Sequence, residues 1–234
     1  MASSPNISWD WEGSYLKVKV LYSRAGLATQ ILVFDDEEQV FLIDSGDGVL
    51  RDLTALPDKL YEKISCIVCS HGHFDHIGGL FSLLGFLRMI NRTTELPLIF
   101  PSGVTEIEGI VRTFKESYTD SIPFEIKYHN SEVNIGKVTI TPFPVQHRGS
   151  IIGFNELPSI PAFGYIIEKG KERILYTGDT GYFDELSVMI NDIDFALIEG
   201  TYEEKKTPFH LSIIEARKLG KLAKNYKIIH KRDS

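Results

Sequence analysis

Segments that predict strands and segments that predict helices follow one another in an order that occurs twice along the chain. Short runs rich in Val, Ile, Leu and Tyr predict strands at 16–22, 29–34, 40–43, 64–69, 96–100, 124–128, 137–143, 162–168, 173–176, 195–198 and 227–229. Segments with predominantly apolar or helically spaced residues predict helices at 48–55, 77–90, 105–118, 183–190 and 211–225. Strands group before residue 70 and after residue 123, and helix–strand units follow each group. The sequence therefore predicts an α/β protein of two similar halves, with helices covering sheet faces.

The composition fits one large domain, and we expect a single domain over residues 1–234. Hydrophobic residues make up 43% and charged residues 24% of the chain, which excludes a disordered chain, a collagen and a coiled coil. No apolar run approaches the ~20 residues that span a bilayer. The N-terminal residues also lack the charged and apolar regions of a signal peptide. We therefore expect a cytoplasmic protein with no membrane association.

Charge is distributed unevenly along the chain. The 25 basic and 32 acidic residues give a net charge of −7, which argues against a general nucleic-acid coat protein. Between Lys205 and Arg232, however, nine Lys or Arg residues stand against one acid, Glu215. A basic segment on an acidic body could face an anionic substrate. The alternative is a lysine-rich helix face that is simply exposed to solvent.

The two cysteines, Cys66 and Cys69, have the C-x-x-C spacing found in metal knuckles and redox motifs. Their setting is different, because Ile67 and Val68 between them make this segment an apolar, strand-like run. In a strand, residues i and i+3 point to opposite faces. We therefore expect two reduced thiols that pack in the core.

The segment Ser-His-Gly-His-Phe-Asp-His-Ile-Gly-Gly holds four potential metal ligands within six residues, directly after a predicted strand. The four are His71, His73, Asp75 and His76. In an extended segment His71 and His73 point the same way, and Asp75 and His76 aim at a second point where the chain turns toward the next helix. Imidazoles and a carboxylate suit zinc, manganese or iron. A solvated histidine-rich loop is the alternative, but this pattern rarely arises by chance after a buried strand.

Three further candidate ligands lie just past predicted strands, where ligand sites of α/β sheets gather. They are His147, Asp179 in Gly-Asp-Thr-Gly, and His230. A single histidine in such a place is usually incidental, but three such placements beside the first motif favour a metal site. His129 lies in a predicted turn, and we leave it out of the site.

The motif H-x-H-x-D-H, a later histidine and Gly-Asp-Thr-Gly together resemble the metallo-β-lactamase superfamily, from about residue 17 onward. Several segments look like ribonuclease Z and its phosphodiesterase relatives: the aspartate turn at Leu42–Gly48, the Leu-rich stretch Leu80–Arg88, Ile198–Tyr202 and His210–Ala216. The resemblance implies a four-layer αβ/βα fold, with two β-sheets sandwiched between helices. It also implies a two-metal site between the two sheets and a homodimer.

The resemblance assigns a role to each candidate residue. His71, His73 and His147 would hold one metal; Asp75, His76 and His230 would hold the other; and Asp179 would bridge them. Asp44 would be an acid that does not bind the metal but accepts a hydrogen bond from a ligand histidine and so orients it. His210, oriented by Glu199, would donate a proton to the leaving oxygen, and Asp75 counts among the catalytic residues as well. The alternatives without a catalytic role are that Glu199 is an ordinary acid after a strand and that His210 is the N-terminal cap of a helix.

Some features depart from the ribonuclease Z pattern. The segment between His147 and Asp179 is only 31 residues long and has no long basic arm for gripping transfer RNA; its loop at 155–161 contains no Lys or Arg. Phe74 stands where ribonuclease Z commonly has Gly, and the residues after His230 read Lys-Arg-Asp-Ser in place of Phe-Ser-x-Arg-Tyr. These departures favour a dinuclear hydrolase in general over one specific for transfer RNA.

The sequence thus predicts a hydrolase with two divalent metal ions, most simply Zn²⁺, with Mn²⁺ or iron as alternatives. The favoured reaction is hydrolysis of a phosphodiester, RNA or a small nucleotide, by a hydroxide between the metals with His210 as proton donor. A hydrolase of a lactone, thioester or β-lactam remains an alternative, as does an iron-binding redox protein. A third alternative is a binding module that has lost activity, although its ligand set is complete.

Overall fold

Two β-sheets form the centre of the protein. The computed structural model describes residues 7–149 and 158–232. The first sheet has seven strands in the order β1-β2-β3-β4-β5-β6-β7. These strands are β1 (Trp11–Glu12), β2 (Leu16–Arg24), β3 (Ala28–Asp35), β4 (Val40–Ile43), β5 (Ile64–Val68), β6 (Leu96–Ile99) and β7 (Ile126–His129). Strands β1 to β4 pair antiparallel, and β4 to β7 pair parallel.

The second sheet has six strands in the order β13-β12-β11-β10-β9-β8. They are β8 (Val133–Ile135), β9 (Val138–Pro144), β10 (Phe163–Lys169), β11 (Glu172–Tyr176), β12 (Phe195–Glu199) and β13 (Tyr226–Ile229). Here too an antiparallel part, β8 to β11, leads into a parallel part, β11 to β13. The repeated order of elements predicted from the sequence is therefore present in both sheets.

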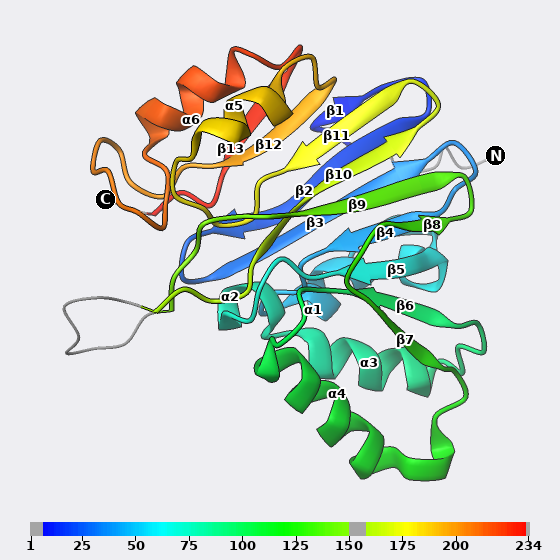
Figure 1. Ribbon diagram of the computed structural model, residues 1–234. Coiled ribbons are helices and arrows are strands. Elements are labelled where there is room, and N and C mark those ends of the chain that lie inside the picture. The colour runs from blue at the N-terminus through cyan, green and yellow to red at the C-terminus, as the bar shows by residue number, and fades with distance from the viewer. Residues whose placement is uncertain (1–6, 150–157, 233–234) are drawn as a thin grey trace.

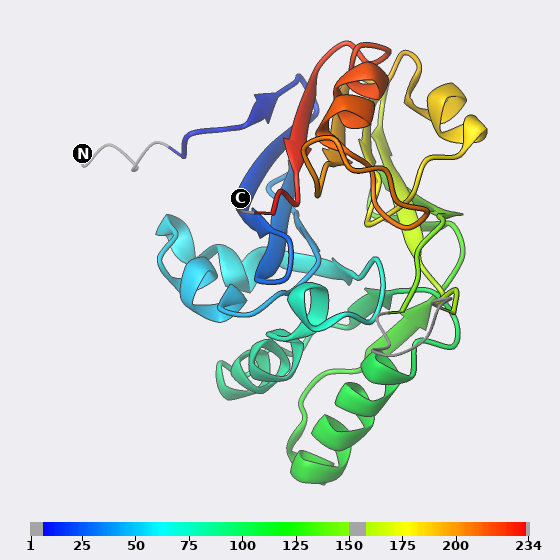
Figure 2. The ribbon, with the colours of Figure 1, turned by 90° about the vertical axis from the view of Figure 1, so that its left-hand side faces the viewer.

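Helices cover the outer face of each sheet, as Figures 1 and 2 show from two directions. The first sheet carries α1 (Val49–Thr54), α2 (Phe74–Ile77), α3 (Leu80–Met89), α4 (Thr105–Tyr118) and the 3-10 turns η1 (Pro57–Lys63) and η2 (Thr119–Ser121). The second sheet carries α5 (Asp184–Ile190) and α6 (Ile213–Gly220). The predicted four-layer αβ/βα fold is confirmed.

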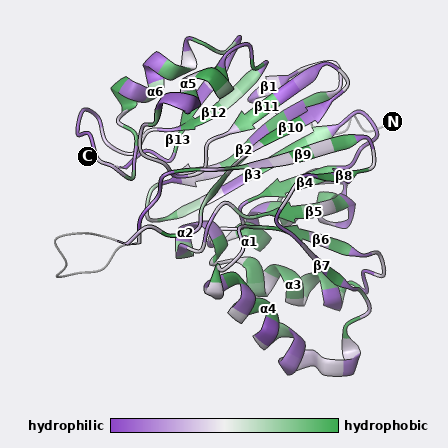
Figure 3. Cartoon of the chain, viewed as in Figure 1, coloured by the Kyte–Doolittle hydropathy of each residue, from purple (hydrophilic) through white to green (hydrophobic). Residues whose placement is uncertain are grey.

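Three hydrophobic clusters separate the four layers. One lies between the sheets and includes Ile31 of β3 and Tyr165 of β10; the other two lie between each sheet and its helices. In Figure 3 the hydrophobic colour is concentrated on the strands and on α3, whereas α4 also carries hydrophilic segments. Cys66 in β5 and Cys69, directly after that strand, are free and buried in different clusters, on opposite faces of the first sheet, as predicted.

The predicted helix at 77–90 is wrong at its start, because the chain forms two helices there. Helix α2 ends at Ile77 and α3 begins at Leu80. The separating residue Gly79 passes so close to the turn after β4 that a Cβ would lie 2.5 Å from the carbonyl oxygen of Gly46. A side chain at this position would clash with backbone, so the contact fixes α2 and its Asp75 and His76 against that turn.

Other predicted boundaries shift by a few residues. Helix α6 ends at Gly220 instead of residue 225, and β7 extends to His129, which was expected in a turn. Strands β1 and β8 were not predicted, because two or three residues are too few to show an alternating pattern. Residues 155–157 of the predicted loop at 155–161 lie outside the described residues. No helix in 7–149 or 158–232 combines the length and hydrophobicity needed to cross a bilayer.

Candidate metal centre

All the candidate residues after strands meet at one edge of the two sheets. Asp44 follows β4 and the histidine motif follows β5, whereas His147, Asp179 and His230 follow β9, β11 and β13 of the second sheet. Except for His73, these side chains are more than nine-tenths buried. The site is therefore assembled from both halves of the chain.

One cluster of nitrogen atoms is formed by His71, His73 and His147. The Nδ1 atom of His73 lies 3.0 Å from Nε2 of His71 and 3.1 Å from Nε2 of His147. Burial, with the neighbouring imidazoles, lowers the pKa of His71 well below its usual value. Burial likewise lowers the pKa of His73, and it lowers the pKa of His147 to about 3. The three rings are therefore neutral at pH 7 and have lone pairs available for a cation.

A second cluster is formed by Asp75, His76 and His230. The Nε2 atom of His230 lies 3.2 Å from Oδ2 of Asp75 and 3.4 Å from Nε2 of His76. Burial acts to raise the pKa of Asp75, but the contact with His230 and the charges of His76 and His230 together outweigh it, and the pKa falls to about 2. Two imidazoles and an ionised carboxylate thus face one point.

Asp179 lies between the two clusters. Its Oδ2 atom is 3.4 Å from Nε2 of both His76 and His230, and 3.9 and 4.0 Å from Nε2 of His71 and His147. Its Oδ1 atom is buried and accepts no hydrogen bond from the described part of the chain. A buried carboxylate oxygen without a donor is costly unless a cation or water satisfies it. The donor set and this oxygen fit a metal centre.

The outer nitrogens of the histidines are held by hydrogen bonds, which leaves the inner nitrogens free to act as ligands. His147 Nδ1–H donates to the carbonyl oxygen of Phe209 (2.9 Å), and His230 Nδ1–H donates to Oγ1 of Thr201 (3.0 Å). His71 Nδ1–H donates to Oγ of Ser70 (3.0 Å). His230 itself has a left-handed backbone (φ 54°), a conformation that non-glycine residues adopt only when their surroundings enforce it.

Asp44 accepts hydrogen bonds from several buried donors. Its Oδ2 accepts from Nδ1–H of His76 (2.7 Å), the hydroxyl of Tyr176 (2.6 Å) and the hydroxyl of Ser70 (2.9 Å), and its Oδ1 accepts from the amide of Ser70 (2.7 Å). Through Ser70 the same carboxylate also supports His71. The structure therefore places Asp44 behind two candidate ligands.

His210 and Glu199 form a hydrogen-bonded pair beside these clusters. His210 Nδ1–H donates to Oε1 of Glu199 (2.9 Å), which also accepts from the amide of Thr180 (2.8 Å); Oε2 of Glu199 accepts from the hydroxyl of Thr201 (2.9 Å). Burial acts to lower the pKa of His210, but the hydrogen bond and charge of Glu199 outweigh it and raise that pKa. Ser212, and not His210, caps α6. The helix-cap alternative for His210 is therefore wrong.

Comparison with known proteins identifies the family. A family model described as a beta-lactamase superfamily domain matches residues 39–229. The chain belongs to the metallo-β-lactamase superfamily. A curated relative named ribonuclease Z, from Parabacteroides distasonis, is 27% identical over 186 residues, which cover 74% of this chain and 56% of the relative. The chain thus spans little more than half the length of that relative.

Solved structures support the superfamily fold. The metallo-β-lactamase fold protein YhfI from Bacillus subtilis aligns with a TM-score of 0.75 at 21% identity, covering 94% of this chain and 88% of that protein. Human tRNase Z, short form, aligns with a TM-score of 0.75 at 20% identity, covering 92% and 93%. Membership of the metallo-β-lactamase superfamily and the observed clusters together support binding of divalent metal ions.

A cavity of about 780 Å³ opens over the metallo-β-lactamase site. Its lining includes His73, Asp75, Asp179, His210 and His230, together with Ala25, Gly26, Phe74, Arg148, Thr201, Tyr202, Phe209 and Arg232. Of the predicted basic segment at 205–232, only Arg232 contributes to this lining as a basic residue. Lys224 pairs with Asp194, and Lys227 pairs with Asp10, away from the cavity. Most of the segment is therefore solvated surface; its charge reaches the cavity through Arg232 in the lining and through Lys205, whose Nζ lies 5.2 Å from the ring centroid of Tyr202.

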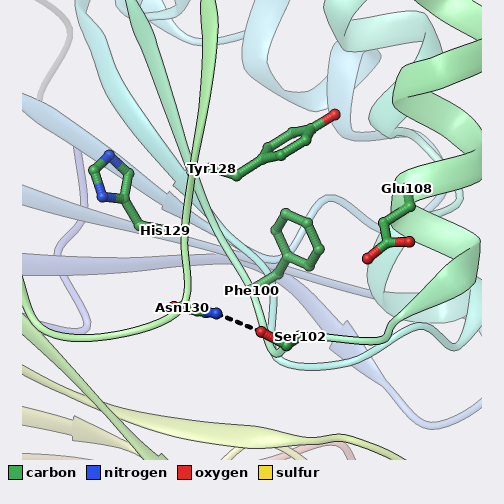
Figure 4. Close-up of a pocket in the computed structure, with 6 residues that line it drawn as sticks. All are labelled: Phe100, Ser102, Glu108, Tyr128, His129 and Asn130. Atoms are coloured by element: carbon green, nitrogen blue, oxygen red, sulfur yellow. Dashed lines mark hydrogen bonds between the residues drawn. The ribbon is translucent and has the colours of Figure 1, made fainter.

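His129 lies in a different, smaller cavity of about 220 Å³ at the ends of β6 and β7. Figure 4 shows it with Phe100, Ser102, Glu108, Tyr128 and Asn130 around that space. None of the potential metal-ligand groups found among the described residues includes His129. Leaving this histidine out of the site on sequence grounds agrees with the structure.

Several supporting residues were not predicted. The hydroxyl of Ser70 contacts the candidate ligand His71, the hydroxyl of Thr201 donates to Glu199, and the hydroxyl of Tyr176 donates to Asp44. The amide of Gly26 donates to Oδ2 of Asp75 (2.8 Å). Ser70 and Thr201 stand in segments that the resemblance already singles out, which is a usable signal. Tyr176 and Gly26 give no such signal, since their contacts join residues far apart in the sequence.

Replacing Asp44 by Asn is expected to weaken metal binding by roughly 10- to 100-fold, because an amide cannot accept from every donor around this carboxylate. Metal retained after dialysis against graded chelator measures the change. Tyr176→Phe is the matched control: it removes one donor and leaves the carboxylate intact, so its effect should be smaller. Equal metal content in wild type and Asp44→Asn would refute the supporting role.

Proposed function

We propose that the protein is a phosphodiesterase of the ribonuclease Z type that uses two divalent metal ions and acts on RNA or a small nucleotide. The observation that carries the proposal is the His210–Glu199 pair beside a full set of candidate ligands. Metal ligands alone fit hydrolysis of many bonds. A separate proton donor is needed when the leaving group is an alkoxide, as in a phosphodiester. The ribonuclease Z relatives support the same reaction class.

In this proposal His71, His73 and His147 would hold one ion; Asp75, His76 and His230 would hold the other; and Asp179, which lies between the two clusters, would contribute to both. Nitrogen-rich sets with carboxylates suit Zn²⁺, and Mn²⁺ or iron are the alternatives that metal analysis would reveal. When bound, such ions act as Lewis acids that polarise a phosphoryl oxygen and make water a stronger nucleophile at neutral pH.

The chain itself supplies orientation and the proton. Thr180, Thr201 and His210 surround the carboxylate of Glu199, which is fully buried, so the acid has one position. It fixes the imidazole of His210 through Nδ1 and favours its charged form. The Nε2–H of that ring is then the donor for a leaving oxygen in the cavity that His210 lines.

A substrate panel tests the reaction class. Zinc-loaded protein should hydrolyse bis-p-nitrophenyl phosphate and short RNA, and should show little activity on nitrocefin, lactones or thioesters. The release of p-nitrophenolate and the products of 3′-labelled RNA measure the two activities. Faster hydrolysis of a lactone, thioester or nitrocefin than of any phosphodiester would overturn the proposal in favour of the other hydrolase class. A coloured, iron-containing protein inactive on all of them would favour the redox class.

A further inference from the structure

We infer that Tyr202 recognises a nucleobase, so that the cavity selects nucleotides over phosphodiesters without an aromatic base. Tyr202 lines the cavity over the candidate metal centre, three residues past Glu199. Its ring lies 6.1 Å from the imidazole of His210, centroid to centroid, at an interplanar angle of 78°. A group that stacks on this ring therefore lies next to the proposed proton donor.

The backbone of Tyr202 is held firmly. Its carbonyl oxygen accepts from the amide of Ile213 (2.7 Å), and the residue forms an isolated bridge with Ser212, the N-cap of α6. On the other side, the amide of Arg232 donates to the carbonyl oxygen of neighbouring Thr201 (3.0 Å). The ring is thus presented from a rigid backbone, which lowers the entropic cost of binding a planar ligand.

Charged side chains, and not the hydrophobic core, cover the ring of Tyr202. Nζ of Lys205 lies 5.2 Å from the ring centroid, and Cζ of Arg232 lies 6.0 Å from it. Both side chains belong to exposed residues, so a stacking ligand can displace them at little cost. Once displaced, these cations are close enough to pair with the phosphate of the same ligand. An aromatic ring bordered by Lys and Arg is the arrangement that single-stranded nucleic-acid sites use.

A second aromatic ring lies in the same cavity. Phe74, which lies between His73 and Asp75 in the sequence, also lines this cavity. Its exposed fraction is 66%, which is large for a phenylalanine. A single exposed apolar residue needs no explanation. Here, however, Phe74 comes from the first half of the chain and Tyr202 from the second, and both line one cavity. A ligand with an aromatic base gains from either ring, whereas an alkyl phosphodiester gains from neither.

The test is equilibrium binding, measured by calorimetry on zinc-loaded protein. Adenosine 5′-monophosphate and ribose 5-phosphate carry the same sugar and phosphate and differ in the base. Wild type should bind the nucleotide more tightly by roughly 5- to 100-fold, the range expected for stacking of one base. Tyr202→Leu should remove most of this preference, and Tyr202→Phe should retain it. Tyr128→Leu, an exposed tyrosine in the cavity of Figure 4, is the matched control and should not change it.

Equal affinity of wild type for the two ligands would overturn the inference. So would a Tyr202→Leu variant that loses affinity for both ligands alike, because the ring would then only support the site. The inference rests on the proposed function for its substrate, but the two can fail separately. Hydrolysis of bis-p-nitrophenyl phosphate without a base preference refutes base recognition alone. A base preference that depends on Tyr202, in a protein that hydrolyses no phosphodiester, refutes the proposed reaction alone.

Discussion

Removal of divalent metal is expected to abolish phosphodiester hydrolysis and to lower the melting temperature by roughly 5–10 °C. The shift follows from mass action: an ion present at 100 times its dissociation constant contributes about 2.7 kcal/mol, and a domain of this size moves by about 2–4 °C per kcal/mol. The physical source is the buried cluster itself. Without cations, Asp75 and Asp179 remain ionised in a buried site, and Oδ1 of Asp179 has no partner among the described residues.

Elemental analysis and calorimetry before and after treatment with chelator measure both effects. Asp179→Asn should lower activity and melting temperature in the same way without chelator, because it removes the negative charge of the carboxylate that lies between the two clusters. Asp184→Asn, on the exposed first turn of α5, is the matched control and should behave as wild type. One ion per chain in fully active protein would contradict the two-metal assignment. Full activity after metal removal would contradict a metal mechanism altogether.

His210→Ala is expected to keep the metals and to lower kcat by roughly 10²- to 10⁴-fold on RNA, whose leaving alkoxide needs a proton. On bis-p-nitrophenyl phosphate the loss should be much smaller, because p-nitrophenolate leaves without one. The reason is geometric: Nδ1 of His210 is hydrogen-bonded to Glu199, and in the proposed assignment the other seven residues would supply the ligands of both ions. His210 nevertheless lies close enough to His147 and Asp179 to be a potential ligand, so metal content must be measured with the rate.

Single-turnover kinetics on both substrates, with metal analysis of the same samples, check this prediction. His129→Ala, which changes a histidine outside the cluster, is the control. His210 Nδ1 also lies 3.9 Å from Oδ2 of Asp179, so a variant that loses an ion would make His210 a ligand. Equal rate loss on both substrates, with the metals retained, would contradict proton donation and remove the main reason for preferring phosphodiesters.

The order of elements was enough to predict an α/β protein of two similar halves, and the dense motif at 70–79 with the polar residues after other strands was enough to predict a metal site. The resemblance to the metallo-β-lactamase superfamily added the four-layer fold and the pairing of Glu199 with His210. The first two signals are local: periodicity predicts a strand, and the residues after it lie at the sheet edge. Contacts between distant segments gave no such signal. The hydrogen bond from Tyr176 to Asp44 joins residues 132 positions apart, and the break before α3 depends on the approach of Gly79 to Gly46. Likewise, the sequence did not show that Lys224 and Lys227 of the basic segment pair with Asp194 and Asp10 and so lie away from the cavity.

The assembly of the site from both sheets makes each proposed ion a cross-link between the halves of the protein. His71 and His73 extend from the first sheet and His147 from the second, and Asp75 and His76 face His230 in the same way. To release an ion completely, the protein must break contacts on both sides of the layer interface. Loss of the proposed ions would then loosen the packing of one sheet against the other as well as remove the reactive centre, so metal content would set how firmly the two halves of the protein are joined.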